Sequence, residues 1–352
     1  MTRVLIVEAA GNLWGSERAL IDLLDGMPRS DVAVCCPPGT PLQAELEKRG
    51  VRTIPTYIYG LHEKPRWRRA QAALGVLRAC LRFRPDVIHL NQSGSYKVVL
   101  PAALLLRLPI VAHVRIFEDA EYLASQAHMA LLRGVIAISD AVEADIRRLP
   151  RLSAVPLSRI YDAYTPVGDA QVVKVAGRIA CVGRLVPIKG QDVLVEALTL
   201  LGDTKVDCKM VGDGDPAFTA RLRQSPGAGA VEWLGFVREV MPLLRTCEVL
   251  ACPSWREPLG RVILEAWDAG SVPVVFAGSG GAAEVVRAAD GGVLYEEQTP
   301  GCLADALRTT LALSPGEKER LVANGRAWMD KTCAPAAYGQ AVMAVFARAA
   351  AR

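Results

Sequence analysis

Two carboxylates in the segment PSWREPLGRVILEA, residues 253–266, have a spacing that could serve ligand binding. Glu257 and Glu265 are separated by seven residues, and a helical pattern of apolar residues begins between them. Carboxylates beside an anion-binding helix start suit a ligand with both phosphate and hydroxyl groups, such as a sugar nucleotide. From spacing alone, a surface helix with two solvated glutamates explains the pair at least as well.

The start and the end of this helix are marked by residues with special backbone properties. Pro258 suits the first helical position, where its missing N–H costs nothing. Gly270 suits the end of the helix. We therefore expect the first glutamate just before the helix and the second about two turns inside it. The free backbone amides near Leu259 and Gly260 would then favour an anion.

A second candidate is the glycine-bounded loop GRLVPIKG, residues 183–190. It joins a predicted strand end to a predicted helix start. Arg184 and Lys189 are then expected in the same strand-end region as the two glutamates. Two cations suit a pyrophosphate, and an arginine can bind one in bidentate fashion. The alternative is a solvated loop.

Short apolar runs alternate with helical patterns along the whole chain, which predicts parallel sheets covered by helices. In the first half we expect strands at residues 3–7, 32–36, 85–90, 110–113 and 135–138, with helices at 16–24, 42–49 and 70–82. The pattern restarts with strands at 179–183, 209–211, 231–234, 249–251 and 272–276, and with helices at 191–201 and 260–268.

The fold class is therefore α/β, with two doubly wound parallel-sheet domains. We expect an N-terminal domain at 1–165, a linker at 166–176, a C-terminal domain at 177–330, and a helix at 331–352 that packs back toward the N-terminal domain. Ligands of such sheets bind at the carboxyl ends of the strands. A site in a cleft between the two facing domains is the expected arrangement.

Composition excludes several classes of protein. Hydrophobic residues make up 51% of the 352 residues and charged residues 22%, so the chain is neither disordered nor a coiled coil. A net charge of +4 is too small to indicate nucleic acid. The nine cysteines show no metal-ligand spacing, and we expect reduced core residues in a cytosolic protein. No apolar run approaches the roughly 20 residues of a membrane span, and the N-terminus enters a strand without a secretory signal.

Five segments together resemble the retaining glycosyltransferases of family 4, which have the GT-B fold of two Rossmann-like domains. They are CVGRLVPIKGQDVLVEAL, MVGDGDP, EWLGF, PSWREPLGRVILEAWDAGSVPVV and GGAAEVV, in the order and spacing of the family over residues 179–310. Any one of these motifs would be weak evidence, but their concurrence is specific.

The resemblance implies roles for the charged residues. Arg184 and Lys189 match the positions that neutralise the donor pyrophosphate. Glu265 matches the carboxylate that binds the ribose hydroxyls. Glu257 matches the first acid of the pair, near the donor sugar.

The resemblance also implies roles for backbone groups. Leu259 and Gly260 would offer amides to the diphosphate. Gly235 and Phe236 lie where the backbone of the family meets the nucleobase. A segment of glycines followed by a glutamate also matches the family, and its glutamate is interpreted as structural: Gly280, Gly281 and Glu284.

The N-terminal half resembles the family less closely. Gly15 and Ser16 lie in the first strand–helix turn, where many members carry two glycines near donor phosphate and acceptor. Helix capping also explains this serine. His113 resembles the histidine beside the donor sugar, with a buried core histidine as the alternative, and His89 is interpreted as mostly structural. Asp162, Ala163 and Tyr164 replace the usual Asn-Gly at the end of this domain.

No metal or cofactor is expected. Asp213 and Asp215 have the Asp-x-Asp form that binds a divalent cation in another glycosyltransferase fold. Here they follow a predicted strand, and we interpret them as turn residues. The resemblance implies front-face transfer, in which the leaving phosphate helps to deprotonate the acceptor hydroxyl. No covalent nucleophile is needed.

A basic segment, residues 64–84, contains seven cations and a tryptophan but no acidic residue. Such a segment can lie on an anionic membrane face. Nucleic acid is not expected, because no recognised binding module accompanies the segment. A solvated helix face is the alternative. The residues with which we expect membrane contact are Lys64, Arg66, Trp67, Arg68 and Arg69.

The resemblance implies a retaining, metal-independent hexosyltransferase with a UDP- or GDP-sugar donor. The acceptor would be a saccharide, and a lipid-linked glycan in cell-surface polysaccharide or glycolipid synthesis fits the basic segment. The protein would be cytoplasmic, with peripheral contact to the inner membrane face as a further expectation. A sugar-nucleotide epimerase of the same fold and a binding-only protein are the alternatives.

Overall fold

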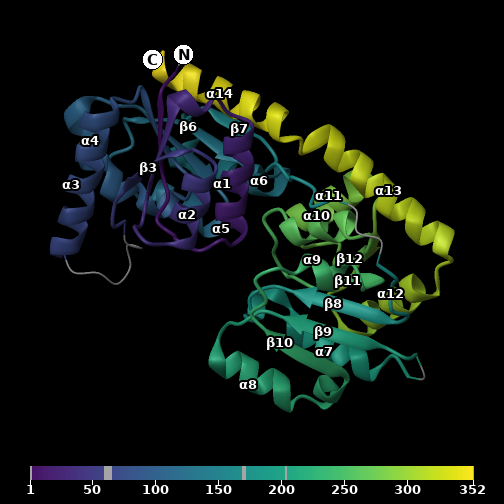
Figure 1. Cartoon of the computed structure of the whole chain (residues 1–352). Coiled ribbons are helices and arrows are strands. Elements are labelled where there is room, and N and C mark those ends of the chain that lie inside the picture. Colours follow the sequence, from purple (N-terminus) through teal and green to yellow (C-terminus); the bar gives the residue numbers. More distant parts are fainter. Residues whose placement is uncertain (1, 59–65, 169–171, 203, 352) are drawn as a thin grey trace. The chain divides into compact units, whose positions relative to one another are not determined.

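The computed structural model describes residues 2–58, 66–168, 172–202 and 204–351. The chain forms two compact units (Figure 1). The first unit contains Met1–Thr165 and Thr332–Arg352, and the second contains Pro166–Lys331. Residues 166–176, which were expected as a linker, therefore fall in the second unit.

The first unit is built on a parallel sheet that has seven strands over the described residues, in the order β3-β2-β1-β4-β5-β6-β7. Its strands are β1 (Val4–Val7), β2 (Val32–Cys36), β3 (Arg52–Pro55), β4 (Val87–Leu90), β5 (Ile110–Val114), β6 (Leu132–Ala137) and β7 (Leu157–Arg159). The four residues of β1 are completely buried, as expected for a central strand that is covered on both faces.

Helices cover the sheet of the first unit. They are α1 (Gly15–Asp25), α2 (Pro41–Lys48), α3 (Arg66–Phe83), α4 (Tyr96–Leu106), α5 (Phe117–Ala124), α6 (Asp140–Arg147) and α14 (Pro335–Ala350). The last of these packs against α1, β4, β5 and β6, so the C-terminal helix is part of the first unit (Figure 1). Its Phe346 is buried in one hydrophobic core with Val4, Ile6 and Leu20.

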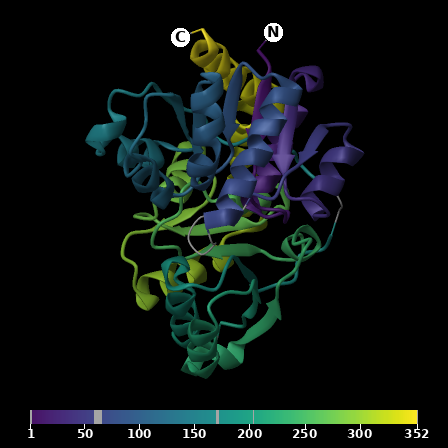
Figure 2. The ribbon, with the colours of Figure 1, turned by 90° about the vertical axis from the view of Figure 1, so that its left-hand side faces the viewer.

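The second unit repeats the architecture. Its parallel sheet has the order β10-β9-β8-β11-β12-β13 over the described residues. The strands are β8 (Arg178–Val182), β9 (Asp207–Val211), β10 (Val231–Gly235), β11 (Val249–Cys252), β12 (Val272–Phe276) and β13 (Val293–Tyr295). The helices are α7 (Gln191–Thr199), α8 (Pro216–Gln224), α9 (Met241–Leu244), α10 (Arg261–Asp268), α11 (Gly281–Ala289), α12 (Pro300–Ala312) and α13 (Pro315–Thr332). A second view shows helices beside the strands of each unit as well (Figure 2).

Strand order determines where each unit can hold a ligand. The order of the first sheet reverses direction between β1 and β4, and that of the second sheet between β8 and β11. Loops diverge at such a switch point, which leaves room for a ligand beyond the carboxyl ends of the strands. The α/β class with two parallel sheets is confirmed.

The structure corrects some expected element boundaries. Helix α10 begins at Arg261, so Pro258 does not take the first helical position. Strand β5 extends to Val114, one residue beyond its expected end at His113. All nine cysteines lie in the described ranges and none forms a disulfide, and eight are buried, in agreement with core residues. Within the described ranges, no helix is both long and apolar enough to span a membrane.

Candidate active site

Three glycines bring together the loops that follow β8, β9 and β10 in the second unit. The amide of Gly212 donates to the carbonyl of Gly235 at 2.8 Å, and the amide of Gly183 donates to Val211 at 3.0 Å. Gly212 has a φ of +133°, and a Cβ there would lie 2.0 Å from the carbonyl oxygen of Gly183. Only glycine tolerates this conformation and this approach, so the backbone itself forms this edge of the site.

Lys189 and Glu257 form an ion pair at the carboxyl end of this sheet. The Nζ atom of Lys189 lies 2.6 Å from Oε2 of Glu257, to which the hydroxyl of Ser254 also donates at 3.1 Å. Burial opposes the charged form of Lys189, but the carboxylate of Glu257 outweighs it, and the pKa of the lysine is raised. The site therefore presents a permanent, positioned cation.

Glu257 is also fixed through its backbone. Its amide donates to the carbonyl of Ser279 at 2.6 Å, and its carbonyl accepts from the amide of Gly281 at 2.8 Å. A Cβ on Gly281 would lie 2.0 Å from the carbonyl oxygen of Pro258. The Gly280–Gly281 turn thus lets the loop after β12 pair with the segment of Glu257.

The second glutamate lies on α10. Gly260 precedes the helix with a φ of +81°, a left-handed conformation that suits glycine. The helix begins at the next residue, Arg261, three positions after Pro258. Glu265 is largely buried, with its Oε1 4.0 Å from Nε of Arg261. Glu265 lies inside this helix as expected, but it is about one turn from the start and not two, and Glu257 precedes the helix by four residues.

The remaining residues of the second unit that were expected to bind the donor lie around the same strand ends, whereas Gly15 and Ser16 lie in the first unit. The side chains of Arg184 and Phe236 are exposed, and Leu259 is buried. The isolated bridge between Leu185 and Gly214 ties the Arg184 loop to the turn after β9. The structure thus brings Arg184, Lys189, Glu257 and the glycine backbone into one unit, and their ligand contacts stay predictions.

Asp215 has a structural role in the turn after β9. Its Oδ1 accepts from the amide of Phe218 at 2.7 Å and so caps α8. Among the residues that the structure describes, no group of three or more His, Cys, Asp or Glu side chains could hold a metal ion. Capping explains Asp215 without a cation.

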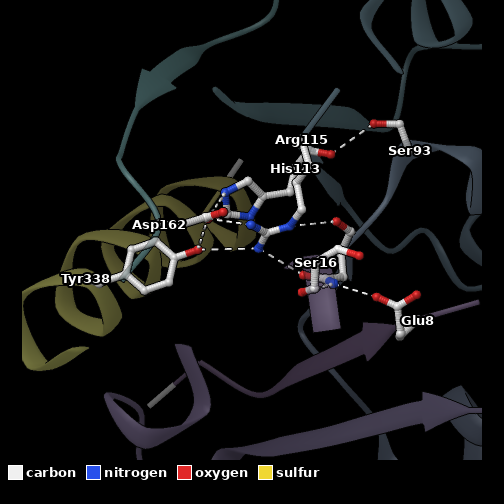
Figure 3. Close-up of polar contacts among 8 residues, drawn as sticks. Glu8, Ser16, Ser93, His113, Arg115, Asp162 and Tyr338 are labelled. Atoms are coloured by element: carbon white, nitrogen blue, oxygen red, sulfur yellow. Dashed lines mark hydrogen bonds and ion pairs between the residues drawn. The ribbon is translucent and has the colours of Figure 1, made fainter. Parts of the chain in front are cut away.

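In the first unit, a polar residue directly follows each of three buried strands. Glu8 follows β1, Asn91 follows β4 and Arg115 follows β5. Their side chains are buried and in contact, together with Asp162 and Tyr338 (Figure 3). The sequence expectations did not include Arg115. The available signal was a charged residue at the end of an apolar run, next to the switch point of the sheet.

The turn that precedes α1 is held by the carboxylate of Glu17. It accepts from the amide of Trp14 at 2.9 Å and from the hydroxyl of Ser16 at 3.1 Å. The side-chain amide of Gln92 donates to the same hydroxyl at 2.8 Å. Gly15, which is exposed, and Ser16, which is half-buried, are the first two residues of α1. This geometry leaves Gly15 and Ser16 accessible beside the β1–β4 switch point.

His113 is completely buried, as is His89, with ring centroids 5.5 Å apart. Neither ring nitrogen of His113 has a hydrogen-bond partner among the described residues. Burial, and then the charge of Arg115, lowers the pKa of both imidazoles, that of His89 to about 3. His113 has no exposed surface in this structure, so its contact with a donor sugar stays a prediction.

Residues 66–83 of the basic segment form α3. Lys64 lies outside the described residues, as does the side chain of Arg66. Trp67 is 61% exposed, and the guanidinium of Arg68 lies 5.1 Å from the centre of its ring. Leu74 and Leu81 are 45% and 57% exposed, one and two heptads after the tryptophan. This spacing places three large apolar side chains along one solvent-facing stripe of the helix.

Two family models match the chain. Residues 15–163 match Glycosyltransferase Family 4, and residues 176–312 match Glycosyl transferases group 1. The chain belongs to this glycosyltransferase family. The matches fall on both structural units and include the strand-end loops described above.

A relative in sequence agrees with this membership, and two solved structures share the fold. D-inositol 3-phosphate glycosyltransferase of Xylanimonas cellulosilytica is 32% identical over 225 residues, which cover 55% of this chain and 53% of the relative. The matched segments span about half or less of the length of the curated relatives. HepE of Anabaena, solved with UDP and glucose, has a TM-score of 0.81 at 21% identity and covers 99% of this chain and 100% of its own. WaaG, a glycosyltransferase involved in lipopolysaccharide biosynthesis, has a TM-score of 0.67 at 17% identity, with 97% and 98% covered.

Proposed function

We propose that this family 4 glycosyltransferase moves a hexosyl group from a nucleotide sugar to a hydroxyl of a saccharide acceptor, with retention of configuration. The observation that carries the proposal is the Lys189–Glu257 pair at the carboxyl end of the second sheet. It lies on a loop system whose glycines expose backbone, in a family of glycosyltransferases. A positioned cation and carboxylate suit the phosphates and hydroxyls of such a donor.

In this proposal the second unit binds the donor. Lys189 and Arg184 neutralise the pyrophosphate, and the amides near Leu259 and Gly260 add to the positive potential. Glu265 binds the ribose hydroxyls, and Glu257 binds hydroxyls of the sugar. The backbone at Gly235 and Phe236 contacts the base, with UDP and GDP as the candidate nucleotides. HepE has been solved with UDP-glucose, which supports this class of donor.

The proposed chemistry is front-face transfer. The bond from the anomeric carbon to the diphosphate oxygen breaks, and a new bond forms to the acceptor oxygen on the same face. The acceptor proton passes to the departing diphosphate. Lys189 and Arg184 stabilise the charge that develops on that leaving group, which lowers the barrier because the cations are already in place. This route needs neither a metal ion nor a covalent nucleophile.

We further propose that the acceptor is a lipid-linked saccharide at the inner face of the cytoplasmic membrane, where the protein binds peripherally. Arg78 and Arg82 are exposed on α3 together with the stripe of Trp67, Leu74 and Leu81. Apolar side chains flanked by cations suit the interface of an anionic membrane. The likeness to WaaG, named for lipopolysaccharide biosynthesis, supports a glycolipid product.

Donor screening tests the function. Thermal shift with UDP-, GDP- and ADP-sugars should reveal the donor, because a ligand at 100 times its Kd stabilises by about 2.7 kcal/mol. Release of nucleoside diphosphate is then measured with a panel of octyl glycosides as acceptors, and the anomeric configuration of the product by NMR. Conversion of the donor to an epimer without acceptor would overturn the proposal in favour of an isomerase. Binding without any turnover would indicate a binding-only protein.

A further inference from the structure

A continuous set of buried polar contacts crosses the carboxyl edge of the first sheet, from α14 to the start of α1. It passes through Tyr338, Asp162, Arg115 and Asn91 and ends at Ser16 (Figure 3). None of the donor-binding residues proposed above for the second unit belongs to it. The contacts therefore need an explanation of their own.

Arg115 is the centre of these contacts. Its side chain is buried, and Nη1 forms an ion pair with Oδ1 of Asp162. Nη2 donates to Oδ1 of Asn91 at 3.0 Å and to the hydroxyl of Tyr338 at 3.4 Å, and Nε donates to the carbonyl of Asn91 at 3.1 Å. A buried charge costs several kcal/mol unless it is paired and hydrogen-bonded, and here Asp162 and Asn91 meet both needs.

Arg115 determines how the amide of Asn91 is oriented. A guanidinium has only donors, so the amide oxygen must face it and the amide nitrogen must face away. That nitrogen donates to Oε2 of Glu8 and, at 3.2 Å, to the carbonyl of Ser16. Both of these partners are acceptors in this geometry. One amide orientation therefore satisfies all groups, and it holds the first turn of α1.

We propose that Arg115 is a positioning residue for the acceptor side of the enzyme, because it orients Asn91 and so holds the accessible turn at Gly15 and Ser16. This inference rests on the proposed function, to which it adds that the acceptor binds the first unit. Arg115 is buried and acts through Asn91. The contact with the saccharide belongs to the exposed turn.

The C-terminal helix completes this arrangement. The hydroxyl of Tyr338 on α14 donates to Oδ1 of Asp162 at 3.0 Å, which keeps the carboxylate against Arg115. The acceptor turn near residue 16 thus depends on a side chain more than 300 positions later in the sequence. The first unit assembled from residues 1–165 alone would lack this hydroxyl.

The test uses two substitutions that retain size in the full-length protein. Asn91→Asp replaces the donating nitrogen with an oxygen that faces the carbonyl of Ser16, which can only accept, and Tyr338→Phe removes one hydroxyl. Tyr96→Phe is the matched control, since the buried Tyr96 donates to the carbonyl of His128 at 2.6 Å elsewhere in the same unit. Hydrogen exchange of residues 11–20 measures the turn without any substrate.

We expect exchange of residues 11–20 to be at least fivefold faster in Asn91→Asp and Tyr338→Phe than in the control, a factor that corresponds to about 1 kcal/mol. With the nucleotide sugar identified by the donor screen and the octyl glycoside that the wild type uses, the acceptor KM should rise about tenfold. The Kd for the matching nucleoside diphosphate should stay within twofold, because the nucleotide is proposed to bind the second unit. A purely structural role would lower Tm and leave the acceptor KM unchanged.

The outcomes separate the two proposals. If the wild type transfers sugar but both variants match the control in exchange and in acceptor KM, the positioning role of Arg115 is wrong. If the wild type transfers nothing, the proposed function fails, and the exchange of residues 11–20 still decides whether Arg115 and Asn91 hold the turn. Unchanged exchange in folded variants overturns the inference in either case.

Discussion

Lys189 and Arg184 are the residues on which the proposed chemistry depends most directly. Substitution of either by alanine should leave the fold intact and lower turnover by about 10²–10³, the usual loss when one charge-stabilising donor is removed. Steady-state kinetics with the donor found by screening checks this. Lys205→Ala, which changes an exposed lysine of the same unit, is the control. Near-normal turnover in both variants would contradict the pyrophosphate assignment.

Glu265 should act mainly in binding. A ribose contact exists in both the ground state and the transition state, so Glu265→Ala should raise the donor KM and the Kd for nucleotide about tenfold while kcat changes little. Calorimetric titration with nucleotide and steady-state kinetics together measure the split. Glu265→Gln keeps the shape and isolates the charge. Unchanged nucleotide affinity with collapsed turnover would indicate a catalytic carboxylate instead.

The buried histidines predict a pH dependence of stability. Burial, reinforced by Arg115, lowers the pKa of His89 to about 3, whereas an unfolded chain protonates histidine near 6.5. The unfolded state therefore binds more protons between these values, and stability falls as the pH drops below about 6.5. Urea unfolding at pH 7.5 and 5.0 measures this effect. Between these two pH values the free energy of unfolding should fall by about 2 kcal/mol less in His89→Leu than in the wild type.

Glu8 provides the opposing control for that measurement. Burial, then the charge of Glu17, raises its pKa to about 7, so the folded state binds the extra proton between about pH 4.5 and 7. Acidification through this range favours the folded state, and Glu8→Gln should therefore steepen the acid destabilisation. If the free energy of unfolding changes equally with pH in the wild type, His89→Leu and Glu8→Gln, these groups are not buried as described.

The residues that the sequence could identify are those tied to a local pattern. Lys189 and Glu257 stand next to glycines and strand ends that can be read from a few neighbouring positions. Arg115 could not be assigned this way, because its partners Asp162 and Tyr338 are 47 and 223 positions away. Its burial and its role arise only from the folded sheet.

At the scale of elements, α1 and α14 meet through glycines. A Cβ on Gly339 would lie 2.1 Å from the carbonyl oxygen of Gly26, a backbone atom that can move only if the main chain shifts. Gly339→Ala should therefore push α14 away from α1 and destabilise the first unit by about 1–3 kcal/mol. Thermal unfolding measures the loss. Gly301→Ala, where nothing lies within 4 Å, should be neutral or slightly stabilising, as helix propensity predicts.

The buried central strands and the edge strand β10 were predictable, whereas the edge strands β3, β7 and β13 were not. Strand β1 is an unbroken apolar run because both of its faces are covered. Strands β3, β7 and β13 lie at sheet edges, are three or four residues long and are only partly buried, so their sequences carry little pattern. The expected helix at 260–268 agrees with α10 to within one residue, but the left-handed Gly260 keeps Pro258 outside its first turn, contrary to the role expected for this proline.

At the scale of the whole molecule, the chain enters the first unit twice. Residues after Thr332 return to pack α14 on the first sheet, so each end of the chain contributes to the same core. A sequence pattern can predict that an Ala-rich tail forms a helix, but the surface that it covers depends on contacts with residues far away in the chain. The core residues Val4 and Phe346 show this separation.

The last prediction concerns the place where the whole protein works. The attraction of the α3 face for an anionic membrane should weaken with salt, because the Debye length falls from about 10 Å at 0.1 M to about 3 Å at 1 M. The contribution of Leu74 and Leu81 should persist, since burial of apolar surface is not screened. Co-sedimentation with vesicles of zero and about 30% anionic lipid, at both salt concentrations, measures the two contributions.

Three variants make that experiment decisive. Replacement of Arg66, Arg68 and Arg69 by serine should abolish most of the vesicle binding at low salt. The control replaces three other exposed arginines of the first unit, at 133, 147 and 148, by serine. It removes the same charge and should change vesicle binding little. Replacement of Leu74 and Leu81 by serine should weaken binding at both salt concentrations. If wild type ignores anionic lipid at low salt, or if the two arginine triples behave alike, α3 is only a solvated face. A soluble acceptor would then fit the protein better than a lipid-linked one.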